Sequence, residues 1–447
     1  MREVAEKRKE KKKEKKSRST TQGKHGKRTN PYRKGLLPRK NGYALLLIIM
    51  AVVAVFFILS LILTDSLPTD LTMAALAIML LTLILADFTF TRRSKGARIT
   101  GIAIALIFIL LFGSVTYYLG SAYAMMSKIS VDSEDGSVGA EVTEKAFNVY
   151  ITGIDQWAGD KGLDLERSDV NMIVSVNPVT KKVLLTSIPR DTYVMLHTAQ
   201  QMDKLTHSGV YGVDETLNTV RDWLGVDLDY YLKLNFTGAR DVINAIGGIE
   251  FYNPTEFKSS IKGYKYEKGN IKLNGKQALY YARERKAFEG KDYLRVENQQ
   301  RVMKAILNKM LSSKTILLHF GEIMEATSKN VETDMPATAM QALVKMQMSD
   351  LSKWDIDTQK IEGEEGQDYV ASLTQKYKFD IYRPYPESEE KCKKKIHDIE
   401  NPSEEELAEA MERREQSFFL NLINHLKGGG EDEEEGEEFD VKENIGY

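Results

Sequence analysis

Three long runs of apolar residues dominate the first part of the chain. They cover residues 43–63, 71–90 and 99–126, and Asp87 is the only charged residue inside them. Each run is long enough to cross a bilayer, because a hydrocarbon core of about 30 Å needs about 20 apolar residues as a helix. A secretory signal peptide has a single apolar stretch of only about 7–15 residues, so it fits poorly. The pattern predicts three transmembrane helices and excludes a fully soluble protein.

Basic residues around these runs predict their orientation. Residues 1–40 contain 17 Lys and Arg against 4 Glu. The loop at residues 91–98 carries four positive charges, whereas the loop at residues 64–70 carries none. An excess of Lys and Arg marks the cytoplasmic side of a membrane. We therefore expect a multi-pass protein of the cell membrane, with its amino terminus in the cytoplasm and everything after about residue 127 outside the cell.

Beyond the apolar runs the pattern becomes that of a folded domain. Residues 127–145 are polar and rich in Gly and Ser, which predicts a linker. Alternating apolar positions predict strands, and positions that repeat every three or four residues predict helices. The expected strands are 147–151, 170–176, 181–188 and 230–236, and the expected helices are 213–224, 238–246 and 295–311. Strands that alternate with helices indicate an α/β sandwich, here over residues 146–385.

The two ends of the chain carry opposite charge. The formal net charge is only −2, but the head at residues 1–42 is basic, and eight of the ten residues at 431–440 are acidic. The head lacks interleaved aromatic residues, so we favour contact with anionic lipid headgroups over nucleic acid. Residues 386–447 carry little apolar mass, which predicts a charged, flexible tail. A helical stretch within it should begin at the cap signal of Ser403.

Several kinds of chemistry are excluded or disfavoured by the residues themselves. The single cysteine, Cys392, excludes an intramolecular disulfide framework, and no two of the six histidines have zincin spacing. Residues 269–277 differ from a phosphate-binding P-loop, because five residues separate the glycines and Gln277 replaces the required Ser or Thr. Asn274 and Gly275 instead predict a turn. For His207 we favour a structural, hydrogen-bonded role.

Charged side chains gather where the first three expected strands begin or end. Asp155 comes soon after the first strand and Asp169 just before the second, and Arg190 and Asp191 follow the third. If these strands are neighbours, the carboxylates and the arginine meet at one edge of the sheet. Open α/β folds bind their ligands at such an edge.

A second group of charged residues follows between residues 283 and 299. Arg283 and Arg285 are two positions apart, so in a strand they would point to the same face. Asp292 comes next, and Arg295 and Gln299 are four positions apart, which puts both on one face of a helix.

Residues of these types suit a pyrophosphate ligand. The planar guanidinium of arginine binds phosphate oxygens with two parallel hydrogen bonds and stays charged. Carboxylates hold a hard cation such as Mg²⁺, which in turn bridges phosphates. A glycosidase would need a carboxyl pair without the arginine cluster. The alternative is that the same residues form solvated surface ion pairs, which contribute little.

These segments resemble the LytR-CpsA-Psr family of cell-wall enzymes. The matching segments are 150–155, 167–171, 185–193, 203–209, 235–238, 246–249, 273–279, 281–285, 292–295 and 298–300. Together they cover about 147–312. The three apolar runs are most similar to the layout of streptococcal capsule-type members, although here a short linker stands where those relatives can have an accessory domain.

The resemblance implies a function and a role for each residue. Family members move a glycan polymer from a polyprenyl-pyrophosphate carrier onto peptidoglycan and release polyprenyl phosphate. Their fold is an α/β/α sandwich with an apolar pocket for the lipid. By resemblance, Asp155 and Asp169 hold Mg²⁺, and Arg190, Arg283, Arg285, Arg295 and Gln299 bind the phosphates. Asp191 and Asp292 either orient the arginines or accept the proton of the acceptor hydroxyl.

Two other functions remain as alternatives at this point. The protein could be a membrane-anchored regulator or scaffold that binds polyprenyl lipids, or a polyprenyl-pyrophosphate phosphatase with water as acceptor. The polymer could be capsule, teichoic acid or another wall glycan, and other cell-wall assembly proteins could be partners. Two acids placed for a metal favour the transferase over pure binding.

Overall fold

The computed structural model describes residues 41–413, apart from residues 66, 93, 131–137, 155–166, 288–290, 313–321, 324, 328–329, 351 and 374–375. Within this part, three helices are long and apolar enough to cross a membrane: α2 (Asn41–Thr64), α3 (Thr69–Thr91) and α4 (Lys95–Ile129). They contain the three predicted runs. The chain divides into two compact units, and the second, residues 53–79 with 109–447, contains every described strand.

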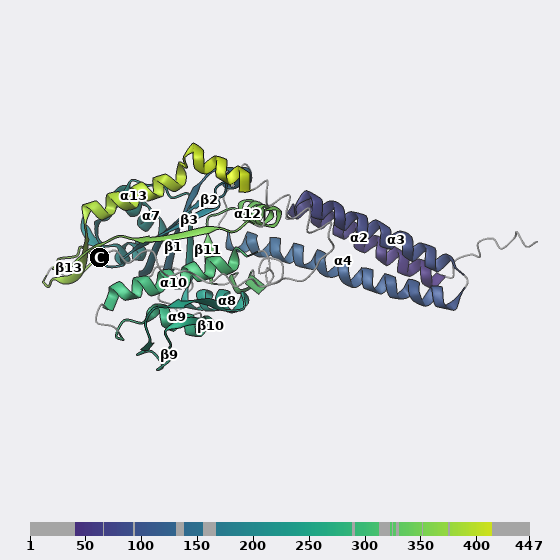
Figure 1. The fold of residues 1–447 in the computed structure, drawn as a ribbon, viewed down its shortest axis with the longest axis horizontal. Coiled ribbons are helices and arrows are strands. Elements are labelled where there is room, and N and C mark those ends of the chain that lie inside the picture. The colour runs from purple at the N-terminus through teal and green to yellow at the C-terminus, as the bar shows by residue number, and fades with distance from the viewer. Residues whose placement is uncertain are drawn as a thin grey trace, which may run out of the picture. The chain divides into compact units, whose positions relative to one another are not determined.

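A six-stranded mixed sheet lies at the centre of the second unit (Figure 1). Its order is β11 (Val331–Thr333), β6 (Tyr230–Asn235), β1 (Phe147–Ile154), β2 (Ser168–Asn177), β3 (Lys182–Ile188) and β12 (Asp355–Lys360). The β1–β6 and β3–β12 pairs are parallel, and the other three pairs are antiparallel. All four strands predicted from alternating residues are present in this sheet.

One face of the sheet is covered by α7 (Val213–Leu224) and α13 (Pro386–Glu400). Successive strand residues point to opposite faces, so this face takes every second residue. Its core consists of Tyr150, Ile173 and Leu184 from the sheet, Leu217, Val220 and Leu224 from α7, and Cys392 and Ile396 from α13. Figure 1 shows both helices on the same side of the strands.

The opposite face is covered by α8 (Phe236–Ala245), α9 (Gly275–Arg283) and α10 (Lys291–Met310) (Figure 1). Here Ile151, Met172 and Leu185 pack with Met303 and Leu307 of α10. Helices α5 (Val138–Glu144) and α12 (Ala337–Ser349) pack around Phe147 at one end. Helices on both faces of the sheet confirm the predicted α/β/α sandwich.

Short strand pairs and small helices complete the domain. The pairs are β4 (Tyr193–Met195) with β5 (Met202–Lys204), β7 (Ile249–Asn253) with β10 (Gly269–Leu273), β8 (Phe257–Lys258) with β9 (Lys265–Tyr266), and β13 (Gly363–Asp368) with β14 (Phe379–Pro384). The helices are α6 (Leu205–Ser208) and the 3₁₀ turn η1 (Gly209–Tyr211).

The domain is larger than the sequence predicted. Residues 386–447 were expected to form a flexible tail, but α13 buries Cys392 and Ile396 against the sheet. A few apolar residues at helical spacing were enough to dock this charged helix, because its other faces remain in water. Ser403 does cap a helical stretch, since its backbone N–H and that of Glu406 bond reciprocally to the two side chains. Within the expected linker, α5 also packs on the domain through Val142.

Candidate functional site

Helix α10 is the shared wall of three cavities. Gln299, Val302 and Ile306 line an apolar cavity, and Arg295 and Val296 line a polar pocket. A third set, Glu297, Gln300, Arg301 and Lys304, lines a groove. Residues three or four positions apart share one stripe of a helix, so this single helix offers a different surface to each cavity.

The apolar cavity has a volume of about 390 Å³ and lies between the sheet and helices α8, α9 and α10. Its sheet lining is Val149, Ile151, Gly153, Val170, Met172, Leu232 and Leu234. Gly153 passes close to the neighbouring strand, because a Cβ there would lie 2.9 Å from Cβ of Val170. Only a few polar side chains, including Arg283 and Gln299, reach the lining. Such a cavity suits an apolar ligand with a polar end group.

Arg283 is the last residue of α9, and its guanidinium carbon lies 4.0 Å from the ring centroid of Phe236. The face of the Phe236 ring attracts the guanidinium cation and holds it over the ring. Arg283 and Arg285 do not lie in a strand, in which both would point to the same face, because α9 ends between them. The two side chains therefore line different cavities, Arg283 the apolar one and Arg285 the polar pocket.

The helix α9 was missed because its start was assigned only to a turn. Asn274 is its N-cap and accepts a bond from the backbone N–H of Gln277, whose side chain bonds back to the N–H of Asn274. This reciprocal capping box is visible in the sequence as Asn-x-x-Gln. Gln277, the residue that disqualifies a P-loop, thus has a structural task.

The polar pocket next along α10 has a volume of about 340 Å³. Arg285 and the buried Arg295 line it together with Asp191, Lys360 and the β13–β14 strand pair, which contributes Glu365 and Asp380. Arg285, Arg295 and Lys360 offer guanidinium and ammonium donors to an anion, and Asp191, Glu365 and Asp380 partly balance their charge.

A compact ion-pair group stands at the end of β3, beside this pocket. Arg190 donates from Nη1 to Oδ1 of Asp169 over 2.7 Å, and its Nε lies 3.4 Å from Oδ2 of Asp191. Lys204 binds the other oxygen of Asp191 at 3.1 Å. The meeting of Asp169, Arg190 and Asp191 at one edge of the sheet agrees with the sequence prediction. Asp191 belongs both to this group and to the polar pocket.

A residue that sequence reasoning missed is Glu284, between the two arginines. Its side chain is fully buried, and Oε1 accepts the backbone N–H groups of Arg285, Lys286 and Ala287 at 2.8–3.0 Å. Burial alone would raise the pKa of Glu284, but bonds from Ser259, Ser260 and this loop outweigh burial and lower it. The carboxylate therefore holds the loop that carries Arg285. The sequence contains a signal for this role, because an acidic residue directly after a helix lies beside the negative end of the helix dipole. Such a residue therefore needs hydrogen-bond partners.

The described residues supply one of the two expected magnesium ligands. Asp169 is present and shares one oxygen with Arg190. Asp155 lies outside the described residues, and so does the side chain of Asp292. Within the described part, no group of three or more His, Cys, Asp or Glu side chains could hold a metal. Two carboxylates with phosphate oxygens and water would suit Mg²⁺, which seldom uses an all-protein cage. The donor types therefore fit this ion.

His207 is a structural residue, as expected. Its Nδ1 lies 2.7 Å from Oδ1 of Asp203 and 2.8 Å from Oγ of Ser372, and both Asp203 and His207 are buried. Because Ser372 and Asp203 approach the same ring nitrogen, the group lacks the relay geometry of a catalytic triad.

The structure thus combines an α/β/α domain, an apolar cavity, a pocket lined by two arginines and three helices of membrane-spanning length. Residues 115–384 match the model of the LytR_cpsA_psr family. This match covers more than half of the chain, and the protein belongs to this family. The resemblance noted from the sequence motifs is thereby confirmed.

Individual relatives agree with this assignment. "Polyisoprenyl-teichoic acid--peptidoglycan teichoic acid transferase TagU" of Bacillus licheniformis is 36% identical over 251 residues, which is 55% of this chain and 79% of the relative. The protein of the same name from Enterococcus faecalis is 33% identical, over 56% of this chain and 83% of its own length. The crystal structure of gbs0355 from Streptococcus agalactiae has a TM-score of 0.51 at 24% identity, covering 61% and 92% of the two chains. That likeness shows the shared fold.

Proposed function

We propose that this protein is a transferase that attaches a glycan polymer to peptidoglycan, taking it from a polyprenyl-pyrophosphate carrier. The observation that carries the proposal is the apolar cavity whose lining includes Arg283, next to the pocket with Arg285 and Arg295. A lipid chain would occupy the cavity, and its pyrophosphate would lie between the arginines. Family membership and the names of the TagU relatives support the same assignment.

The proposed reaction is a phosphoryl transfer. The oxygen of an acceptor hydroxyl, on a muramic acid of peptidoglycan, forms a bond to the phosphorus that carries the glycan. The bond from this phosphorus to the bridging oxygen breaks, and the bond electrons leave with polyprenyl phosphate. Asp191 or Asp292 would accept the hydroxyl proton. The reaction needs no external energy source, because one phosphoanhydride bond is exchanged for one phosphodiester.

The site residues would act mainly by positioning and by charge neutralisation. Phosphoryl transfer requires little covalent help from a protein, so fixed cations around the phosphates supply most of the acceleration. We assign phosphate binding to Arg190, Arg283, Arg285, Arg295 and Gln299. Arg190 would bind in exchange for part of its present pairing with Asp169 and Asp191.

Mg²⁺ belongs to this proposal as the cation that Asp155 and Asp169 would hold. Asp169 is the second residue of β2 and follows Ser168, which pairs with Ile154 at the end of β1. Asp155 follows Ile154 in the sequence. When bound, the ion would neutralise part of the pyrophosphate charge.

A transfer assay tests this function directly. Full-length protein in detergent would be incubated with a polyprenyl-pyrophosphate-linked glycan, peptidoglycan and Mg²⁺. We expect glycan bound covalently to peptidoglycan and an equal amount of polyprenyl phosphate. Release of phosphate lipid without transfer would indicate the phosphatase instead. Lipid binding without either product would indicate the regulator or scaffold, and mass spectrometry of the wall linkage in a deletion strain would identify capsule, teichoic acid or another polymer.

The function also requires the domain to lie outside the cytoplasmic membrane. Charge asymmetry predicts a cytoplasmic amino terminus and external residues 128–447. Protease added to intact wall-stripped cells should therefore digest the large domain and spare the basic head. Protection of the large domain would contradict both the orientation and the proposed acceptor.

A further inference from the structure

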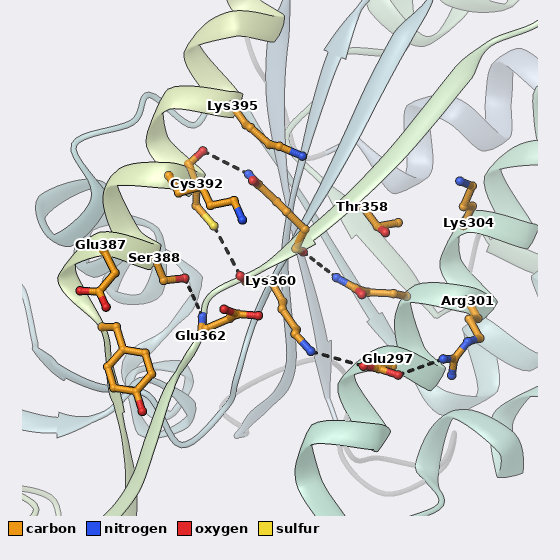
Figure 2. A pocket seen from close by; sticks show the side chains of 14 residues that line it. Glu297, Arg301, Lys304, Thr358, Lys360, Glu362, Glu387, Ser388, Cys392 and Lys395 are labelled. Atoms are coloured by element: carbon orange, nitrogen blue, oxygen red, sulfur yellow. Dashed lines mark hydrogen bonds and ion pairs between the residues drawn. The ribbon is translucent and has the colours of Figure 1, made fainter. Parts of the chain in front are cut away.

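A wide groove lies across the edge strand β12 of the sheet, between α10 on one side and α13 on the other. Its volume is about 710 Å³, and β12 forms its floor (Figure 2). Five cations line it: Arg301 and Lys304 from α10, Lys360 from β12, and Lys391 and Lys395 from α13. Cys392 also reaches it, but burial raises the pKa of this thiol to about 11, so the residue is no nucleophile at neutral pH.

Three carboxylates share the groove, and one of them is already neutralised. Glu297 binds Nη2 of Arg301 at 2.9 Å and lies 3.3 Å from Nζ of Lys360, a chain of contacts that Figure 2 shows. Glu362 and Glu387 lie at the end of the groove near the start of α13. Arg301 and Lys360 share Glu297, so the excess positive charge of the groove comes mainly from Lys304, Lys391 and Lys395.

The cations are arranged in two rows. Arg301 and Lys304 are three positions apart on α10, and Lys391 and Lys395 are four apart on α13, so each row repeats at about 5–6 Å. Within the described residues, Lys304 and Lys391 form no hydrogen bond or ion pair, and Lys395 has only a solvent-exposed contact with Asp357 at 3.1 Å. A single phosphate could occupy only part of this length. The geometry favours an elongated ligand with repeated negative charges.

The groove also connects to the polar pocket. Lys360 lines both recesses, and Glu297 in the groove directly follows Val296 in the pocket. A polymer attached to a pyrophosphate in the pocket could therefore continue along α10 without crossing the domain. One wall of this path, α13, begins after residue 384, where the match to the family model ends.

We infer that this groove, called here the α10–α13 groove, binds the first repeats of a polyanionic donor polymer whose units are joined by phosphodiesters. The inference rests on the proposed function, since it assigns a substrate class to the same site. Cations along the path would hold the polymer by replacing its counterions, so binding should be sensitive to salt. A neutral polysaccharide would gain little affinity from these positively charged side chains.

The binding experiment uses full-length protein in detergent and fluorescent poly(glycerol phosphate) as the probe. The test variant is Lys391→Gln with Lys395→Gln. The matched control is Lys393→Gln with Lys394→Gln, on the same helix but outside the groove, where the two lysines pair with Glu390 and Asp398. We expect about tenfold weaker binding in the test variant only. Its slope of log affinity against log salt should fall by about 1.4, because each contact to a flexible strand contributes about 0.7.

Competition identifies the ligand class. A neutral dextran of equal length and inorganic phosphate should not displace the probe at concentrations where unlabelled polymer does. Equal loss of binding in both double variants, or displacement by inorganic phosphate at the same concentration as polymer, would overturn the inference. Stronger binding of soluble peptidoglycan fragments would overturn it as well, because the groove would then belong to the acceptor.

Transfer assays separate this inference from the proposed function. With a polymeric anionic donor, the test variant should show a raised KM and an unchanged kcat. With a donor that carries one neutral sugar, it should match the wild type. If the wild type transfers no glycan, but the test variant alone loses polymer binding, the proposed function is refuted and polymer binding in the groove is supported. If the wild type transfers glycan and the test variant has normal kinetics with the polymeric donor, polymer binding in the groove is refuted.

Discussion

The face of the sheet that meets α7 and α13 and the face that meets α8, α9 and α10 are made by alternate residues of the same strands. On the first face, Tyr150 and Ile173 are completely buried among side chains. On the second, their neighbours Ile151 and Met172 border a cavity of about 390 Å³. The two faces therefore share the same strands, register and apolar character. Side chains fill the first face, here called the closed face, whereas the second, the hollow face, contains a cavity.

This difference indicates that the hollow face serves a ligand. Protein interiors normally pack as densely as organic crystals, and unfilled apolar volume forfeits dispersion contacts. Selection for stability alone would favour a larger side chain at a cavity-lining position such as Ala239. The three arginines Arg283, Arg285 and Arg295 also lie on or beside the hollow face.

The largest expected effect comes from removing an arginine on the hollow side. Changing Arg283, Arg285 or Arg295 singly to Ala should lower transfer by roughly 100–1,000-fold, because one preorganised donor to a charged transition state is worth about 2.7–4 kcal/mol. Replacement by Lys should restore little of the transfer rate, because Lys keeps the positive charge but lacks the planar pair of N–H donors of Arg. Transfer rates and thermal unfolding should be measured on the same samples.

Arg221 on α7 provides the matched control for these variants. It lies on the closed face and donates to Asn218 Oδ1 and to the carbonyl oxygen of Leu228. Arg221→Ala should reduce stability without a comparable change in transfer. Full activity in Arg283→Ala and Arg285→Ala, with Mg²⁺ present, would refute the assignment of the hollow side as the phosphate site.

Much of the fold was predictable because its signals are local. Alternation predicted β1, β2, β3 and β6, and apolar run length predicted the three membrane-length helices. Strand adjacency then brought Asp169, Arg190 and Asp191 together, as expected. Charge pattern could not predict α13, because its docking depends on a few apolar residues meeting a sheet face far away in sequence.

The predictions about the site failed where local geometry was wrong. In a strand Arg283 and Arg285 would point to one face, whereas a helix end separates them and they line two different cavities. Glu284 was passed over because its role depends on Ser259 and Ser260, which are distant in sequence. The cavity itself could not be predicted, since a void is a property of packing and leaves no mark in the alternation of residues.

The second prediction compares added volume on the two faces. Val220→Phe on α7 should destabilise the domain by about 1–3 kcal/mol, because Val220 is fully buried in a filled core. Ala239→Phe adds more atoms but lines the cavity, so it should change stability little. It should instead reduce the polyprenyl lipid that co-purifies with the protein and reduce transfer. Equal destabilisation by both variants would mean that the cavity is not an open space in solution.

The third prediction concerns the loop on the hollow side. Glu284→Gln keeps the shape but loses a charged acceptor of three backbone N–H groups, so transfer should fall about tenfold while Arg285→Ala on this background costs less than in wild type. Such non-additivity separates a positioning role from a general loss of stability. Additive losses in the double variant would contradict the idea that Glu284 acts through Arg285.

The smallest effect on transfer is expected at the buried carboxylate of Asp203, where only stability should change. Burial would raise the pKa of Asp203, but hydrogen bonds from His207, Ser372 and Lys204 outweigh burial and lower it. Because its pKa is lower in the folded state, the ionised carboxylate stabilises the fold at pH values above its ordinary pKa of about 3.9. This stabilisation is lost as the pH falls through the folded-state pKa. Asp203→Asn should therefore cost about 1–3 kcal/mol at pH 7. This difference from wild type should shrink below about pH 4, which denaturant unfolding at several pH values would measure. Transfer by the folded variant should stay near wild type, and a difference in stability that grows at acid pH would contradict the assigned role of the carboxylate.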